Sequence, residues 1–130
     1  MRQAVSEKPI NILMVEDCKS DVILFRHLLG PVQQQCTITD VPRMIDAFKQ
    51  IDNRLFDVIL LDLNLLDLDG VANISAIKAE CPFTPVVIYS GRNDEKLQKE
   101  ARMVGAAGFI IKGETSAAKV QETIAMALAH

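Results

Sequence analysis

The chain has 130 residues, near the usual size of a single domain, and 49% of them are hydrophobic, so a sizeable core is expected. Its formal net charge of −3 disfavours direct binding to nucleic acid. No apolar run reaches the roughly 18 residues that a membrane-spanning helix needs. The three cysteines form no CxxC pair and the polar N-terminus lacks a signal peptide's apolar segment. We therefore expect free thiols, no zinc site and a cytoplasmic location.

The hydrophobic pattern predicts strands that alternate with helices along the chain. In order, we expect strand 10–15, helix 20–29, strand 36–41, helix 43–51, strand 57–61, helix 71–80, strand 86–89, helix 94–104, strand 108–111 and helix 116–129. Glycines mark two helix ends, since Gly30-Pro31 follows the first helix and Gly105 follows the fourth. The start of the fourth helix is assigned to an Asn93 cap.

Five strand–helix units in so short a chain require short loops, and they predict a parallel sheet with helices on both faces. The second strand, Cys36-Thr37-Ile38-Thr39, alternates between polar and apolar residues and is therefore expected at an edge of the sheet. The sequence contains no internal repeat, low-complexity tract or linker. We expect one α/β domain at residues 10–130, preceded by an N-terminal extension at residues 1–9.

Carboxylates follow two of the expected strands at the point where each strand ends. Four apolar residues, Val58-Ile59-Leu60-Leu61, predict a strand buried on both faces, so Asp62 should lie at its C-terminal end. Glu16-Asp17 follows the apolar strand 10–15 in the same way. In open α/β sheets the carboxyl ends of the strands form the ligand-binding edge. Oxygen ligands gathered at this edge predict a Mg²⁺ site.

Two further strand ends complete this edge. Ser90 follows the strand at 86–89, and Lys112 follows the strand at 108–111. Carboxylates, one hydroxyl and one ammonium together suit phosphoryl transfer to a carboxylate. An Asp can act as the nucleophile, a magnesium ion neutralises charge on the phosphoryl group, and the ammonium and hydroxyl bind phosphoryl oxygens.

In this order and spacing, the chain resembles the receiver domain of two-component response regulators over about residues 10–129. The residues that carry the resemblance all lie at or just after strand ends. They are Glu16 and Asp17 for the acidic pair, Asp62 for the phosphorylated aspartate, Asn64 two residues later, Gly70 closing the loop, Ser90 for the switch hydroxyl, Phe109 for the switch aromatic and Lys112 for the conserved lysine of the family.

The resemblance implies a flavodoxin-like, doubly wound, five-stranded parallel sheet of order 2-1-3-4-5 with five helices. It implies that Asp62 accepts a phosphoryl group from a sensor histidine kinase or a histidine phosphotransfer protein. Asp17, Asp62 and the backbone carbonyl of Asn64 would bind Mg²⁺, with Glu16 acting through a water. Lys112 would hold phosphoryl oxygens together with the Ser90 hydroxyl.

The resemblance also implies a switch in which Ser90 moves toward the phosphoryl group and Phe109 rotates inward. The surface formed by helix 94–104, strand 108–111 and helix 116–129 would then change its binding to a downstream protein or to a second copy of the chain. No direct contact with nucleic acid or membrane is expected. Such a protein accepts a phosphoryl group without being a turnover enzyme, and its output domain could belong to a longer protein.

Four positions depart from the common family pattern. Gly113 replaces a proline that usually follows the lysine in a cis peptide; a non-proline cis bond costs about 2.5–4 kcal/mol, so a trans, reshaped loop is expected. Leu66 replaces a common proline, and Phe109 replaces a common tyrosine. Gly91 stands where a larger small residue is common, which predicts more room above the phosphoryl site and easier access of water or donor.

Two alternatives stay open on the sequence alone. The segment Asp67-Leu68-Asp69-Gly70-Val71 resembles the nucleophile loop of haloacid-dehalogenase phosphatases, although there the first Asp directly ends the strand, as Asp62 does here. The chain could also be a degenerate receiver that binds proteins without being phosphorylated. Phosphotransfer to Asp62 separates the receiver from the degenerate module, and turnover of a general phosphate ester would favour the phosphatase.

Overall fold

The computed structural model describes residues 9–64 and 70–129. Within them, five strands form one parallel sheet of order β2-β1-β3-β4-β5, which confirms the predicted topology and places β2 at an edge. The strands are β1 (Ile10–Val15), β2 (Cys36–Val41), β3 (Val58–Leu61), β4 (Val86–Ser90) and β5 (Gly108–Ile111).

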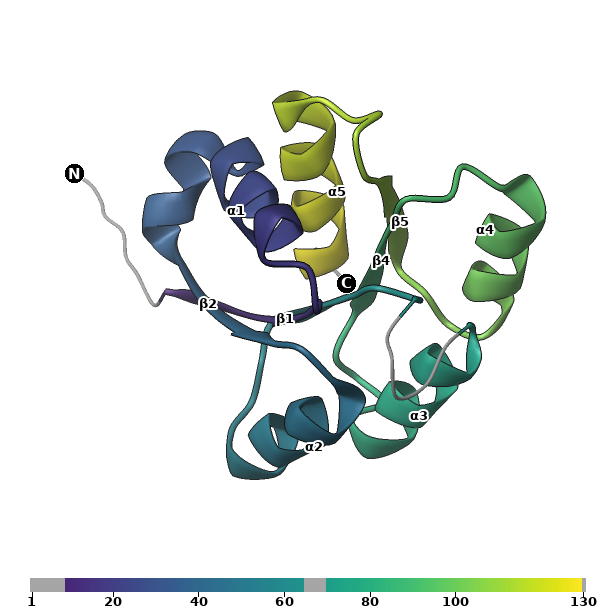
Figure 1. Cartoon of the computed structure of the whole chain (residues 1–130). Coiled ribbons are helices and arrows are strands. Elements are labelled where there is room, and N and C mark those ends of the chain that lie inside the picture. Colours follow the sequence, from purple (N-terminus) through teal and green to yellow (C-terminus); the bar gives the residue numbers. More distant parts are fainter. Residues whose placement is uncertain (1–8, 65–69, 130) are drawn as a thin grey trace.

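Helices cover both faces of the sheet, as Figure 1 shows. Helices α1 and α5 lie on one face, whereas α2, α3 and α4 lie on the other. Their bounds are α1 (Lys19–Leu28), α2 (Met44–Asn53), α3 (Ala72–Glu80), α4 (Glu95–Met103) and α5 (Ala117–Leu128), each within a few residues of the predicted range.

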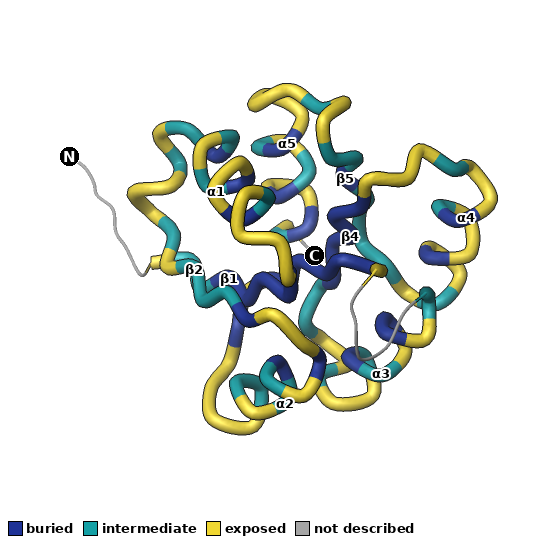
Figure 2. The backbone as a smooth tube through the Cα atoms, in the orientation of Figure 1, coloured by how far each residue is buried: buried dark blue, intermediate teal, exposed yellow. Residues whose placement is uncertain are grey.

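Two hydrophobic clusters, one on each side of the sheet, form the core. On one side Phe25 of α1 and Ile124 of α5 pack with residues of the sheet, and on the other side Ile74 of α3 and Leu97 of α4 do so. All four residues of β3 are buried, and the central strands form the buried middle of the molecule in Figure 2. Burial of each large aliphatic side chain stabilises the fold by about 1.5–3 kcal/mol. Packing on both sides therefore holds the strands in place, and with them the carboxyl ends of the strands at one edge of the sheet.

Two helix ends differ from the sequence prediction. The Asn93 cap was wrong, because Asp94 is the N-cap of α4 and its side chain accepts hydrogen bonds from the backbone N–H groups of Lys96 and Leu97. Both residue types suit this position, and the chain turns into the helix one residue later than predicted. After α1, Gly30 adopts a φ of 58° and begins the 3₁₀-helix η1 (Gly30–Gln35), so the helical chain continues past the predicted stop.

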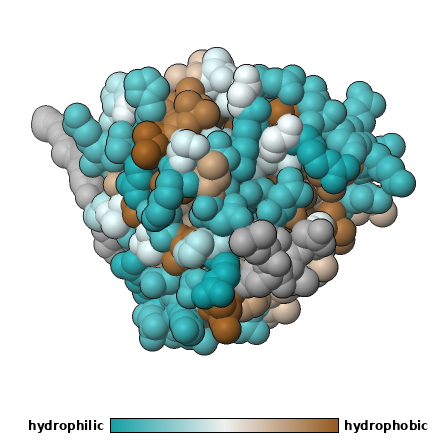
Figure 3. All heavy atoms as spheres, viewed as in Figure 1, coloured by the Kyte–Doolittle hydropathy of each residue, from teal (hydrophilic) through white to brown (hydrophobic). Residues whose placement is uncertain are grey.

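Several predictions lie outside the described residues. They concern the N-terminal extension up to residue 8, the Leu66 position, and Asp67 and Asp69 of the phosphatase-like segment. Of the helices in the described ranges, none has the length and apolarity to cross a membrane. The face seen in Figure 3 is mainly hydrophilic, with hydrophobic side chains in small groups.

Candidate functional site

Backbone hydrogen bonds just beyond the strands hold the predicted site residues at one edge. The N–H of Glu16 donates to Val41 O (2.9 Å), and the N–H of Asp62 donates to Val15 O (3.0 Å). Between β4 and β5, the N–H of Lys112 donates to Ser90 O (2.8 Å). Because these bonds extend the parallel ladders by one residue, each polar side chain emerges at the carboxyl end of its strand.

The ammonium group of Lys112 lies among three carboxylates. Its Nζ atom is 2.6 Å from Glu16 Oε1, 2.9 Å from Asp21 Oδ2 and 3.3 Å from Asp62 Oδ2. The Lys112 side chain is only 16% exposed, and those of Glu16 and Asp62 are 1% and 5% exposed. Ion pairs so poorly exposed to water are weakly screened, so this lysine offsets much of the carboxylates' mutual repulsion.

A second feature of the site is a compact acidic cluster of Glu16, Asp17 and Asp62. One carboxylate oxygen from each residue lies within 4.8 Å of the others. Glu16 Oε1 is buried and makes no hydrogen bond within the described part of the chain, although the Lys112 ammonium lies beside it. Oxygen ligands and excess negative charge fit Mg²⁺.

The Asp62 carboxylate is buried and oriented through both of its oxygens. Oδ1 accepts a hydrogen bond from the backbone N–H of Asn64 (3.0 Å), and Oδ2 accepts one from Lys112 Nζ (3.3 Å). The residue as a whole is 4% exposed. A carboxylate held in one orientation at the opening of the sheet edge is suited to act as a nucleophile.

Ser90 and Phe109, the predicted switch pair, lie on neighbouring strands. Ser90 is fully buried, and its Oγ accepts a hydrogen bond from the backbone N–H of Arg92 (3.2 Å). Phe109 is partly buried and packs against the cluster that contains Leu97 of α4. The aromatic ring therefore packs on the side of the sheet that α2, α3 and α4 cover.

Burial and charge shift the acid–base properties of the site. Burial, together with the charge of Asp62, raises the pKa of Glu16 to about 7, although the ion pair with Lys112 opposes this rise. Burial alone would lower the pKa of Lys112, but its contacts with Glu16, Asp21 and Asp62 outweigh burial and raise it. At neutral pH the lysine is thus a permanent cation, whereas Glu16 titrates.

The loops around the site use glycine where the backbone turns left-handed. Gly70 has a φ of 72° and its N–H donates to Leu63 O (2.9 Å), which closes the loop after Asp62. Gly113 has a φ of 78°, a conformation that glycine adopts without strain. No described peptide bond is cis, so the Lys112–Gly113 bond is trans, as expected from the missing proline.

Two residues of the site were not predicted from the sequence. Asp21, in the first turn of α1, forms an ion pair with Lys112. The ring of Tyr89 lies under the same ammonium, with its centroid 5.3 Å from Nζ. Asp21 resembles an ordinary acidic residue in a helix's first turn; the one available signal was its position four residues after Asp17. Tyr89 directly precedes Ser90, but it reads as a core residue of a strand.

Comparisons with known proteins identify the family of the chain. A family model described as the response regulator receiver domain matches residues 12–124. The transcriptional regulatory protein ZraR of Escherichia coli O157:H7 is 31% identical over 121 residues, which are 93% of this chain and 27% of that protein. The regulatory protein LuxO of Vibrio cholerae is 36% identical over 99 residues, 76% of this chain and 21% of that protein. The chain thus spans about a quarter of the length of these curated relatives.

Solved structures share the fold. The signal receiver domain of a putative LuxO repressor protein from Vibrio parahaemolyticus matches with a TM-score of 0.81 at 26% identity, covering 93% of this chain and 91% of that one. The chemotaxis response regulator CheY4 of Vibrio cholerae matches with a TM-score of 0.79 at 21% identity, covering 93% and 100%. Since the family model matches most of the chain, the protein belongs to the response regulator receiver domains of two-component systems.

Proposed function

We propose that Asp62 accepts a phosphoryl group from a sensor histidine kinase or a histidine phosphotransfer protein. The observation that carries this proposal is the position of the Asp62 carboxylate, which is buried beside Glu16 and Asp17 and lies 3.3 Å from the Lys112 ammonium. A carboxylate oxygen of Asp62 attacks phosphorus, the P–N bond of the donor's phosphohistidine breaks, and the imidazole nitrogen leaves. The product is an aspartyl phosphate, formed without turnover of a small-molecule substrate.

Different residues of the chain would bind the metal ion and the phosphoryl group during this transfer. Asp17, Asp62 and the Asn64 carbonyl would hold Mg²⁺, with the Glu16 carboxylate acting through a water. The ion would supply positive charge that neutralises the phosphoryl oxygens. The Lys112 ammonium, already 3.3 Å from Asp62 Oδ2, would bind another phosphoryl oxygen.

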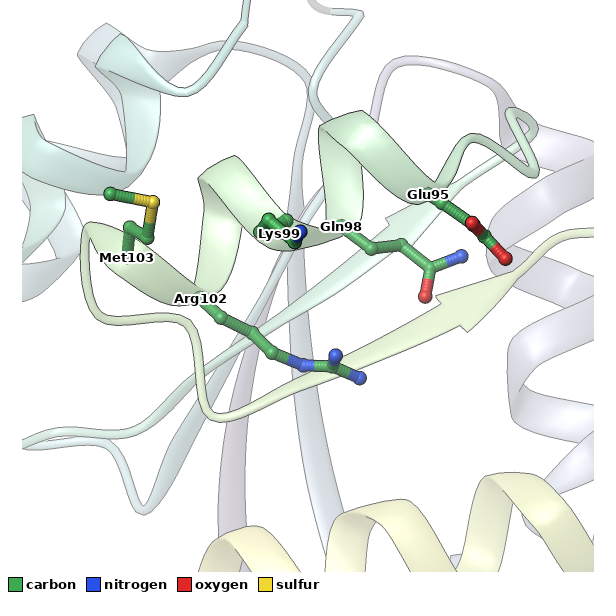
Figure 4. A pocket seen from close by; sticks show the side chains of 5 residues that line it. All are labelled: Glu95, Gln98, Lys99, Arg102 and Met103. Carbon is green, nitrogen blue, oxygen red and sulfur yellow. The ribbon is translucent and has the colours of Figure 1, made fainter.

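Signalling would start at Ser90. The Ser90 Oγ accepts a hydrogen bond from the Arg92 N–H, so its own O–H is the donor that would bind a phosphoryl oxygen when the side chain moves toward it. That movement would free space for Phe109 to turn inward and would alter the surface of α4, β5 and α5, a two-state response to one local charge event. The affected surface includes a depression on α4 lined by Glu95, Gln98 and Arg102, which project from the same side of the helix, and by Lys99 and Met103 (Figure 4).

The partner of this surface is proposed to be a protein, either a second copy of the chain, a separate protein, or an output domain of a longer protein. The lengths of ZraR and LuxO, named as regulators, support the last option. We propose no direct contact with nucleic acid or membrane. The three cysteines are unpaired, which is consistent with a cytoplasmic site of action.

Phosphorylation by acetyl phosphate, read by intact mass, tests the proposal. Wild-type protein should gain one phosphoryl adduct in the presence of Mg²⁺ and none after chelation with EDTA. Asp62→Asn should gain none. Asp52→Asn, which makes the same substitution at an exposed position of α2, should behave as wild type.

Each other result has a distinct meaning. An adduct that persists in Asp62→Asn would contradict the assignment of Asp62. No adduct on wild-type protein that binds Mg²⁺ would favour the degenerate, phosphorylation-independent module. Steady turnover of p-nitrophenyl phosphate would favour the phosphatase.

A further inference from the structure

Asp21 gives the Lys112 ammonium a partner outside the acidic cluster. Its Oδ2 atom lies 2.9 Å from Lys112 Nζ and accepts a hydrogen bond from it. The Asp21 side chain is 27% exposed, and it comes from the first turn of α1, not from a strand end. The compact cluster of potential metal ligands contains Glu16, Asp17 and Asp62 but not Asp21.

Tyr89 supports the same position of the ammonium. The ring face lies 5.3 Å from Lys112 Nζ, within the range of a cation–π interaction. Its hydroxyl donates to the backbone carbonyl of Asp21 (3.4 Å), so the ring and the first turn of α1 are linked. The ring also packs at a tilt against Phe25, with centroids 5.6 Å apart. Asp21, through an ion pair, and Tyr89, through its ring face, thus hold the Lys112 ammonium on the α1 side of the site.

A cation in the acidic cluster must share two carboxylates with Lys112. Glu16 and Asp62 both belong to the cluster, and both contact the lysine ammonium. When a divalent ion binds these carboxylates, its charge repels the ammonium and weakens both ion pairs. Asp21 can keep its ion pair with Lys112, because it contributes no oxygen to the cluster.

We infer that Asp21 is a positioning residue that holds the Lys112 ammonium aside when Mg²⁺ enters the acidic cluster, and thereby raises the affinity of the site for Mg²⁺. This inference rests on the Mg²⁺ site of the proposed function. Without the Asp21 carboxylate, the ammonium would depend on Glu16 and Asp62 alone and would compete with the ion for both. Binding of Mg²⁺ and the position of the ammonium would then be coupled through the Glu16 and Asp62 carboxylates.

Mg²⁺ titration provides the test, and the chain offers its own probe. It has no Trp and a single Tyr, so tyrosine fluorescence reports on Tyr89 beside the lysine. We expect Asp21→Asn to raise the Kd for MgCl2 by about five-fold, the upper range for one partly exposed ion pair. Asp21→Glu should recover most of the affinity, because it keeps a carboxylate in this turn. Isothermal titration calorimetry gives the same Kd without reliance on the fluorophore.

Two controls separate the role of Lys112 from simple loss of charge. Glu114→Gln removes one negative charge from the exposed middle of the β5–α5 loop and should leave the Kd unchanged. In a Lys112→Met background, where no ammonium competes, Asp21→Asn should change the Kd by less than about two-fold. Circular dichroism establishes that each variant is folded, and the Asp21→Glu comparison does not depend on the Lys112→Met protein.

The outcomes distinguish this inference from the proposed function. An unchanged Mg²⁺ affinity in Asp21→Asn, or an equal loss with and without Lys112, would overturn the role of Asp21 while leaving the Mg²⁺ site intact. Failure of wild-type protein to bind Mg²⁺ would overturn both the inference and the magnesium part of the proposed function.

Discussion

The buried carboxyl of Glu16 should make the stability of the protein depend on pH. Its pKa is raised to about 7, from an ordinary value of 4.5, chiefly because burial penalises the charged form. Between these two values the folded state binds more protons than the unfolded chain. The free energy of unfolding should therefore fall as pH rises from about 4.5 to 7, by about 3 kcal/mol in total at roughly 1.4 kcal/mol per pH unit.

Urea unfolding followed by circular dichroism at pH 5, 6, 7 and 8 measures this dependence. Glu16→Gln cannot ionise at this position and should flatten the fall seen in metal-free wild-type protein. Saturating Mg²⁺ should stabilise wild type more at pH 8 than at pH 5, since the ion's charge favours the ionised form of the Glu16 carboxylate beside it. Equal pH dependence in wild type and Glu16→Gln would refute the assignment of this titration to Glu16.

Three other substitutions test separate features. Among the described atoms, a Cβ at Gly91 would meet nothing within 4 Å, so Gly91→Ala should fold normally. The added methyl should exclude water and lengthen the acyl-phosphate lifetime about two- to five-fold. Intact mass over time measures this lifetime, and an unchanged or shorter one would count against easier access of water at Gly91. Asp94→Ala should lower the Tm of thermal unfolding by a few degrees through loss of the α4 cap, whereas Asp94→Asn should retain it. A Cβ at Gly108 would lie 2.8 Å from Thr123 Cγ2, so Gly108→Ala should cost about 1–3 kcal/mol in urea unfolding. Thr123→Ser removes that methyl and should restore most of the loss; no recovery would contradict this packing argument.

The residues that end strands could be placed from the sequence because the sheet is parallel. Buried apolar runs identify the strands, and consecutive parallel strands bring their carboxyl ends to one edge. Asp62 and Lys112, fifty residues apart, meet for this reason. The polar alternation of β2 likewise placed it at an edge. The full strand order, in contrast, came from the family resemblance and not from the pattern.

The residues that surround Lys112 from outside the strand ends could not be placed in this way. Asp21 reaches the site because the first turn of α1 contacts Tyr89 of β4 and Lys112, which follows β5. An amphipathic pattern does not fix where a carboxylate on that turn points. Tyr89 lies in an apolar strand and fits the pattern of a core residue, so the pattern does not predict its contact with the Lys112 ammonium. The choice between Asn93 and Asp94 as the α4 cap depended on a single residue's backbone conformation.

The most direct test of the central claim is the position of the phosphoryl group itself. After phosphorylation by acetyl phosphate with Mg²⁺, borohydride reduces an aspartyl phosphate to homoserine, and mass spectrometry of the peptides locates the converted residue. The account predicts homoserine at position 62 and nowhere else. Conversion at another carboxylate, or phosphate retained on Ser90 instead, would contradict the account of the site.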